Sequence, residues 1–206
     1  MTLNDPAELS STVRGVTRSD TLELSQVLAR AFADDAIVQH VLPDDRSRRP
    51  SLERTYRLYF KVFLRQGACY TTGEQAGAAL WLPPGKYPLT ASQHLALLPG
   101  MWHALGSRRL PNALRVLGYL ETLHPAGRKF WYLGLVGVEP SRQKSGLGSA
   151  LMQPVIGICD DTGVGAYLET GTESNLAFYA RHGFSTLQES RIPDGPRVWC
   201  LWRDPV

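Results

Sequence analysis

The sequence predicts an α/β fold with at least one parallel crossover, and three observations carry this prediction. The last third of the chain alternates apolar segments of strand length with segments of helical periodicity, in the order strand, helix, strand, helix, strand. The 206 residues are 43% hydrophobic and 20% charged, which is enough apolar material for one sizeable core. The chain also lacks internal repeats. We therefore expect a single domain over residues 1–206.

The first half is predicted to contain a short strand, two helices and a strand pair. Asp20, with Glu23 three residues later, resembles a capping box at the start of the first helix. Apolar residues recur at helical spacing after it: Leu24, Val27, Leu28, Ala31 and Phe32. Gly67 is expected to end the second helix. The expected ranges are 13–17 for the strand, 51–66 for the second helix, and 68–72 and 77–82 for the strand pair.

The second half is predicted to begin with a helical block and to continue with the alternating elements. Residues 91–123 have helical spacing that is interrupted near Pro99-Gly100 and near Leu110-Pro111, and this block is expected to be an insertion or lid. The other expected elements are a strand at 131–138, a polar loop at 139–145, a helix at 146–162, a strand at 165–170, a short helix at 175–182 closed by Gly183, and strands at 184–188 and 197–203.

Charge and hydropathy argue against several classes of protein. The net charge of +3 is small and scattered, so no nucleic-acid partner is expected. The densest basic cluster, Arg46, Arg48 and Arg49, is partly cancelled by two neighbouring aspartates and is interpreted as a solvated loop. No segment approaches the roughly 20 apolar residues that cross a bilayer, and residues 1–11 lack the features of a signal peptide.

Cysteine and histidine usage points to a cytoplasmic protein without a metal. Three separated cysteines form no CxxC pair and suit a reducing compartment. The five histidines show no HExxH spacing. We expect no membrane partner, and either a monomer or a homodimer.

The segment from Val136 to Gly148, Val-Gly-Val-Glu-Pro-Ser-Arg-Gln-Lys-Ser-Gly-Leu-Gly, is the most informative for function. A predicted strand leads into a loop that opens a helix, whose first turn has N–H groups without partners and a dipole that favours an anion. Gly146 and Gly148 remove side chains where a ligand oxygen would approach the backbone. A pyrophosphate is the natural ligand. The alternative is that two glycines simply ease the loop into the helix.

The pattern Gln143-x-x-Gly146-x-Gly148, after a Val-x-Val-x-Pro strand, resembles the acetyl-CoA signature of the GNAT superfamily of acetyltransferases. Tyr167-Leu-Glu-Thr170 and the segment from Asn175 to Phe184 resemble the later part of the same superfamily. Similarity to puromycin N-acetyltransferase-like members extends over Gly148-Ser149-Ala150, Pro154, Leu168-Glu169-Thr170, Asn175, Phe178-Tyr179, Gly183-Phe184, Gly195-Pro196-Arg197 and Trp199-Cys200. The strong part of the resemblance covers about residues 131–203.

The resemblance implies a mixed, mostly antiparallel central sheet with one splayed parallel strand pair, helices on both faces, and the 91–123 block between strands 3 and 4. It also implies acetyl-CoA as cosubstrate and direct attack of a small-molecule amine on the thioester. The residues it assigns to the cofactor are Val136, Gly137, Val138, Gln143, Lys144, Ser145, Gly146, Leu147, Gly148, Ser149 and Asn175.

Two catalytic residues are predicted. Tyr179 is the candidate proton donor to the departing thiolate, because a phenol gives a proton while uncharged at rest; the alternative is that Tyr179 packs in the core and Asn175 caps a helix. Glu169 is the candidate base; the alternatives are that Glu169 only anchors a loop, or that a water relay takes the proton. Asp34 and Asp35 either attract a cationic amine or form a solvated helix end.

Two other functions are weighed. Gly146-x-Gly148 with Glu169 downstream fits a dinucleotide-binding oxidoreductase, but the third glycine position is Leu151 and too little chain follows to complete that sheet. A non-catalytic acyl-CoA sensor is the second alternative. O-acetylation and longer acyl groups stay open. An aminonucleoside or antibiotic-like amine is one acceptor that the resemblance suggests.

Overall fold

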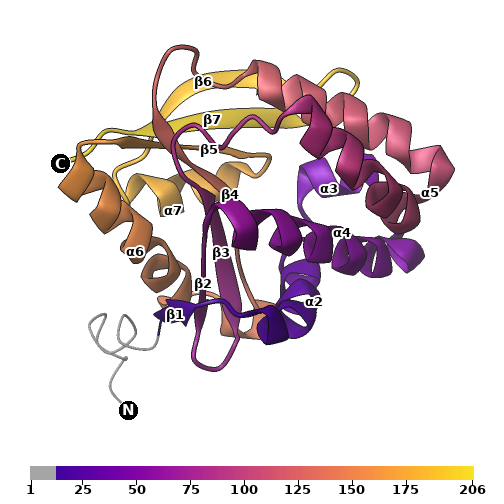
Figure 1. Cartoon of the computed structure of the whole chain (residues 1–206), viewed down its shortest axis with the longest axis horizontal. Coiled ribbons are helices and arrows are strands. Elements are labelled where there is room, and N and C mark those ends of the chain that lie inside the picture. The colour runs from indigo at the N-terminus through magenta and orange to yellow at the C-terminus, as the bar shows by residue number, and fades with distance from the viewer. Residues whose placement is uncertain (1–12) are drawn as a thin grey trace.

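The computed structural model describes residues 13–206, and these form one seven-stranded sheet with helices on both faces (Figure 1). The strand order is β1-β2-β3-β4-β5-β7-β6, and only β4 and β5 pair in parallel. The strands are β1 Val13–Gly15, β2 Ala68–Thr72, β3 Gly77–Leu82, β4 Phe130–Val138, β5 Gly165–Thr170, β6 Ser185–Arg191 and β7 Arg197–Arg203. The expectation for residues 1–11 lies outside the described part.

The helices are α2 Thr21–Ala31, α3 Ala36–Val41, α4 Asp45–Gln66, α5 Ala91–Thr122, α6 Leu147–Thr162 and α7 Leu176–Ala180. Short 3₁₀ turns lie at Arg18–Asp20, Pro140–Arg142 and Glu173–Asn175. The predicted fold class is confirmed, and strands β2, β3, β5 and β7 have the predicted bounds. Among the described residues, no helix is both long and apolar enough to span a bilayer.

Four local predictions were wrong. The capping box joins Thr17 to Asp20 rather than Asp20 to Glu23, and the Asp20 carboxylate instead accepts hydrogen bonds from Arg14. α3 was not predicted. The arginine cluster is not a solvated loop but the first turns of α4, where buried Arg48 donates to the carbonyl oxygens of Leu42 and Pro43 at 2.7 and 2.9 Å. Arg48 therefore fixes the entry to α4.

The fourth error concerns the break in α5. The helix continues through both Pro99 and Pro111, and the non-helical residue is Gly106, with φ of 73°. A positive φ is a conformation that glycine adopts without steric cost. A proline inside a helix loses a hydrogen bond and crowds the carbonyl four residues earlier, yet the backbone is helical at both prolines here. The proline dipeptides were therefore the wrong signal for the interruption.

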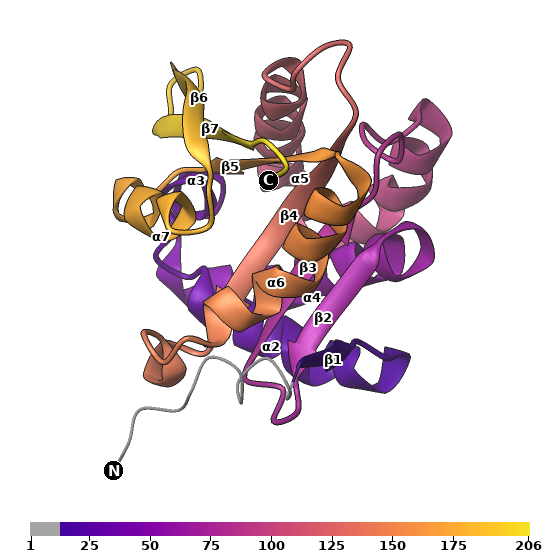
Figure 2. The same cartoon turned by 90° about the vertical axis from the view of Figure 1, so that its left-hand side faces the viewer.

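Two layers of core lie on the two sides of the sheet. α6 packs its apolar side, including Leu151, Met152 and Val155, on one face. α2, α4 and α5 cover the other face, where Phe60 and Leu28 are fully buried. Figure 2 shows α6 in front of the strands and α2 and α4 behind them.

The parallel pair separates soon after it forms. β4 and β5 are paired only through Phe130↔Gly165, Trp131↔Ala166 and Tyr132↔Tyr167. Beyond these positions β4 remains paired with β3, while β5 remains paired with β7. In Figure 2 the two strands run off in different directions from this point. The carboxyl-terminal part of β4 therefore has an open edge toward β5.

Candidate active site

A cavity of about 500 Å³ lies at this separation of strands. Its walls come from α3, α4, α5, β4, β5 and α7. From β4 it is lined by residues 132–136, and from β5 and the turn that follows by Glu169, Thr170 and Gly171. Both predicted catalytic residues, Glu169 and Tyr179, line the same cavity. The structure thus brings together two side chains that the sequence only placed on separate elements.

A β-bulge shapes the floor of the cavity. Leu80 is paired with Leu135 and Trp81 with Leu133, so Gly134 has no partner on β3. A Cβ atom on Gly134 would overlap the ring of Phe63 on α4. Only glycine lets the bulged strand lie against this ring, and the bulge turns the backbone of β4 next to the open edge.

The predicted phosphate loop connects β4 to α6. Lys144 and Gly146 both have left-handed backbone, with φ of 62° and 86°. Among the described residues, none accepts a hydrogen bond from the backbone N–H groups of residues 144–149. The loop from Ser141 to Gly146 is exposed. Consecutive unpaired N–H groups at the positive end of a helix form an anion-binding surface, so the residues present fit a pyrophosphate.

The other predicted cofactor residues lie along β4 and the loop. Val136 lines the cavity, whereas Gly137 packs against Leu28 and Phe32 of the α2 region. The carbonyl oxygen of Val138 already accepts a hydrogen bond from Nε2 of Gln143 at 3.2 Å. This contact gives Gln143 a role in shaping the loop. The side chain of Ser145 likewise bonds within the loop, to the carbonyl oxygen of Arg142 at 2.6 Å.

The first turn of α6 continues the same surface. Leu147 is buried beneath it, and Gly148 faces the ring of Phe178. The hydroxyl of Ser149 lies 3.0 Å from Nε2 of His182, a contact that joins α6 to the segment after α7. The start of α6 is therefore held by side chains from both sides.

Tyr179 lies on α7 and is 8% exposed. Its ring packs between Phe178 and Phe184, with centroids 5.2 and 6.0 Å away. No other described residue forms a hydrogen bond with its hydroxyl. Burial raises the pKa of this hydroxyl, and the Asp35 carboxylate adds to the rise, so the phenol stays protonated at neutral pH. It is an available proton donor in the cavity.

Asn175 begins the segment that carries Tyr179. Its Nδ2 atom lies 3.4 Å from Oγ1 of Thr170, and it lines the cavity. It makes no side-chain cap hydrogen bond to α7. Asn175 thus occupies the N-cap position of α7 without capping it through its side chain, which instead ties the end of β5 to the start of α7.

Glu169 projects from β5 toward the face covered by α5. Its side chain is 5% exposed, and its Oε1 atom lies against Nε2 of His124, an ion pair when the imidazole is protonated. Oε1 has no hydrogen bond of good geometry to any described residue. His124 follows α5, and this connection is fixed because the hydroxyl of Tyr167 donates to the carbonyl oxygen of Leu123 at 3.2 Å. Burial without full pairing is costly for a carboxylate and is common at functional sites.

No sequence motif includes His124, which is one of five scattered histidines. The sequence also did not indicate the aromatic residues around this pair. The ring of His124 lies 4.5 Å from that of Tyr87, 5.0 Å from that of Tyr132 and 4.8 Å from that of Tyr167. Tyr87 and Tyr132 line the cavity beside Glu169.

The remaining predicted acids have structural contacts. Asp35 caps α3 by accepting hydrogen bonds from the N–H groups of Ile37 and Val38 at 2.9 and 3.1 Å, although it also lines the cavity. Asp34 is exposed. Glu139, at the start of the expected polar loop, forms a bidentate ion pair with Arg30 of α2, with Nε to Oε2 at 2.8 Å. That pair anchors the beginning of the phosphate loop.

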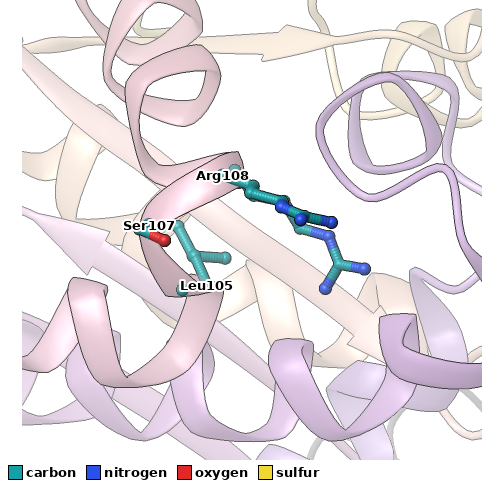
Figure 3. A pocket seen from close by; sticks show the side chains of 5 residues that line it. Leu105, Ser107 and Arg108 are labelled. Carbon is teal, nitrogen blue, oxygen red and sulfur yellow. The ribbon is translucent and has the colours of Figure 1, made fainter.

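A second, smaller hollow of about 260 Å³ lies at the break in α5 (Figure 3). It is lined only by residues 105–109, and Figure 3 shows the side chains of Leu105, Ser107 and Arg108 around it. It contains no pair of groups that could exchange a proton. Among the described residues, no cluster of His, Cys, Asp and Glu could hold a metal ion either.

Comparison with known proteins agrees with this geometry. Residues 112–184 match the acetyltransferase (GNAT) family model. An uncharacterized N-acetyltransferase of Schizosaccharomyces pombe is 26% identical over 181 residues, which are 82% of this chain and 72% of that protein.

Two solved structures share the fold. The histone acetyltransferase HPA2 and related acetyltransferase from Corynebacterium glutamicum has a TM-score of 0.72 at 24% identity, over 95% of this chain and 96% of that one. A Drosophila melanogaster polyamine N-acetyltransferase, which forms N-acetylagmatine, has a TM-score of 0.57 at 15% identity, over 93% and 98% of the two chains. The chain therefore has the GNAT acetyltransferase fold, and its residues 112–184 are similar to the GNAT acetyltransferase family.

Proposed function

We propose that this protein is an acetyl-CoA-dependent N-acetyltransferase that transfers the acetyl group directly to an amine of a small molecule. The observation that carries the proposal is the placement of Glu169 and Tyr179 in one cavity at the separation of β4 and β5. The acyltransferase assignment is supported by the GNAT family match. The amine acceptor is supported by relatives that are named N-acetyltransferases.

Three parts of the chain would hold acetyl-CoA. The N–H groups of residues 144–149 would bind the pyrophosphate, because they lack partners among the described residues. The open edge of β4, which includes Val136, would bind the pantetheine arm through backbone groups. Asn175 lies on the opposite side of the cavity, at the end of β5.

Acetyl-CoA supplies an acetyl thioester, whose C–S bond breaks as the C–N bond to the amine forms. Glu169 accepts a proton from the attacking amine, and His124 holds the carboxylate in place. Tyr179 donates its hydroxyl proton to the leaving sulfur. The phenol regains a proton from solvent or from the acceptor side. Overall, an alkylammonium and the thioester give an amide, a thiol and one proton, which Glu169 releases to solvent.

The test is calorimetric titration with acetyl-CoA, followed by release of free thiol across a panel of amines. Binding followed by amine-dependent thiol release is the expected result. Binding without release for every amine would instead assign the non-catalytic sensor, and no binding would remove both. An aminonucleoside belongs in the panel because of the resemblance to puromycin N-acetyltransferase-like members.

A further inference from the structure

The part of the cavity that α4 and α5 line, called the acceptor part below, has largely apolar walls. α4 contributes Tyr56, Tyr59 and Phe63, and α5 contributes Met101 and several leucines. Tyr56 and Phe63 are buried in the same core that packs on the sheet. A charged ligand group placed against Phe63, Met101 and the leucines would lose its hydration without gaining hydrogen bonds, which costs free energy, and Tyr56 and Tyr59 offer only neutral hydroxyls. The walls therefore favour an apolar body.

The charges in the cavity have one sign. Its titratable lining residues include the acids Asp35, Glu121 and Glu169 together with His94, and no lysine or arginine among the described residues lines it. Asp35 already has hydrogen bonds from the α3 backbone and lies 3.2 Å from the hydroxyl of Thr172. Glu121 is 3.2 Å from Nε2 of His94. Glu169 is the acid with a buried oxygen that lacks a hydrogen bond.

Two of these acids act on the same region. The carboxylates of Glu169 and Glu121 both contribute to the raised pKa of Tyr87, after the larger effect of its burial. Tyr87 therefore lies in the negative field of Glu169 on β5 and of Glu121 near the end of α5. An anionic group on a ligand would be repelled by these carboxylates, and among the described residues no lysine or arginine lines the cavity to offset the repulsion, while His94 and His124 already lie against Glu121 and Glu169. A single cationic nitrogen would be attracted.

We propose that the acceptor is an apolar primary amine, with one cationic nitrogen on an aryl or alkyl body and without an anionic group. This inference rests on the proposed transferase function and narrows its substrate class. It excludes amino acids and amino-phosphates, because no lysine or arginine among the described residues lines the cavity to bind their anions. It also disfavours polyamines, because most of the wall from α4 and α5 is apolar and the acids Asp35 and Glu121 already have partners.

The test compares three amines of equal chain length: hexylamine, 6-aminohexanoate and 1,6-diaminohexane. Free thiol release is measured with the full chain and saturating acetyl-CoA. We expect kcat/KM for hexylamine to exceed that for 6-aminohexanoate by about 100-fold or more, and that for the diamine by about 10-fold. Phenethylamine and phenylalanine form a second pair that differs by a carboxylate, with the same expected order.

A charge-reversal variant tests whether the substrate preference comes from charges in the cavity rather than from the overall charge of the protein. Glu121→Lys places a cation in the acceptor part, and we expect the preference for hexylamine over 6-aminohexanoate to fall about 10-fold. Asp161→Lys makes the same charge change on the exposed end of α6 and should leave the preference unaltered.

The outcomes distinguish the two proposals. If 6-aminohexanoate or the diamine is the better substrate, the apolar-amine inference is overturned while the transferase function stands. If acetyl-CoA binds but no amine of this set or of the wider panel causes thiol release, the transferase function fails. The inference then fails with it. Equal loss of preference in Glu121→Lys and Asp161→Lys would also contradict the cavity origin of the selectivity.

Discussion

His124 and Glu169 form a buried pair across the cavity wall, with side chains that are 8% and 5% exposed. The connection after α5 carries the histidine and β5 carries the glutamate. Because Tyr167 lies two residues before Glu169 and holds the carbonyl oxygen of Leu123, the register of this pair is fixed by one hydrogen bond. The pair gives the first two predictions.

Glu169→Gln is expected to lower kcat by about 100-fold for ordinary alkylamines, because the amide cannot accept the amine proton. An amine that is already unprotonated at pH 7.5, such as 2,2,2-trifluoroethylamine, should be affected much less. Thiol release measured with both amines checks this. An equal loss with both would show that Glu169 is not the base.

His124→Gln is expected to lower kcat by about 10-fold for alkylamines while the KM for acetyl-CoA is unchanged, since the histidine acts through Glu169. The loss should again be smaller for trifluoroethylamine, which a merely structural role would not produce. His103→Gln, on the exposed surface of α5, is the matched control. A raised KM for acetyl-CoA together with a lower melting temperature would indicate a packing role only.

Tyr179→Phe keeps the ring packing with Phe178 and Phe184 and removes the proton donor. We expect acetyl-CoA to bind with unaltered affinity, while kcat falls by about 100-fold. Calorimetry and thiol release measure the two quantities separately. Wild-type turnover in this variant would remove the assignment.

Gly146→Ala tests the phosphate loop, with Gly163→Ala as its control. Both glycines flank α6 and have left-handed φ angles, of 86° and 66°. An alanine at either position costs about 1 kcal/mol of conformational strain. Only the change at Gly146 should raise the dissociation constant for acetyl-CoA, by about 10-fold. A similar increase in Gly163→Ala would mean that the effect comes from general destabilisation.

Asp20 gives a prediction about stability and pH. Its carboxylate, 6% exposed, accepts two hydrogen bonds from Arg14, and this guanidinium holds the pKa of Asp20 well below its usual range. A depressed pKa in the folded state means that the stabilisation is complete above the unfolded value of about 3.9 and is lost as pH falls further. Arg14 is 39% exposed, so solvent weakens the pair.

We therefore expect Asp20→Asn to lower the free energy of unfolding by about 1–2 kcal/mol at pH 7. The difference from the wild type should shrink below about pH 4. Urea denaturation at pH 7, 5 and 3.5 measures it, and Asp161→Asn on the exposed surface is the control. A difference that is constant over this range would contradict the charged pair as its source.

The local pattern of the sequence determined most strands and the position of the phosphate loop. β3 and β5 are short apolar runs that begin at glycine, and their bounds depend mainly on neighbouring residues. The loop from Gln143 to Gly148 was recognisable because an anion-binding helix end is built from consecutive backbone groups. The local pattern of neighbouring residues likewise predicted that Tyr179 lies on a short helix and Glu169 on a strand.

Contacts between distant residues were decided only by the tertiary structure. Glu139 and Arg30 are 109 positions apart, so nothing near Glu139 indicated an ion pair. The same holds for His124 with Glu169, and for the acid-lined, aromatic cavity that α4 and α5 close over the sheet. Packing of helices on the sheet sets the Glu139–Arg30 contact, and the cavity lies where β4 and β5 first pair and then separate. Sequence periodicity reports which face of an element is buried, but it carries no information on which distant side chain meets it there.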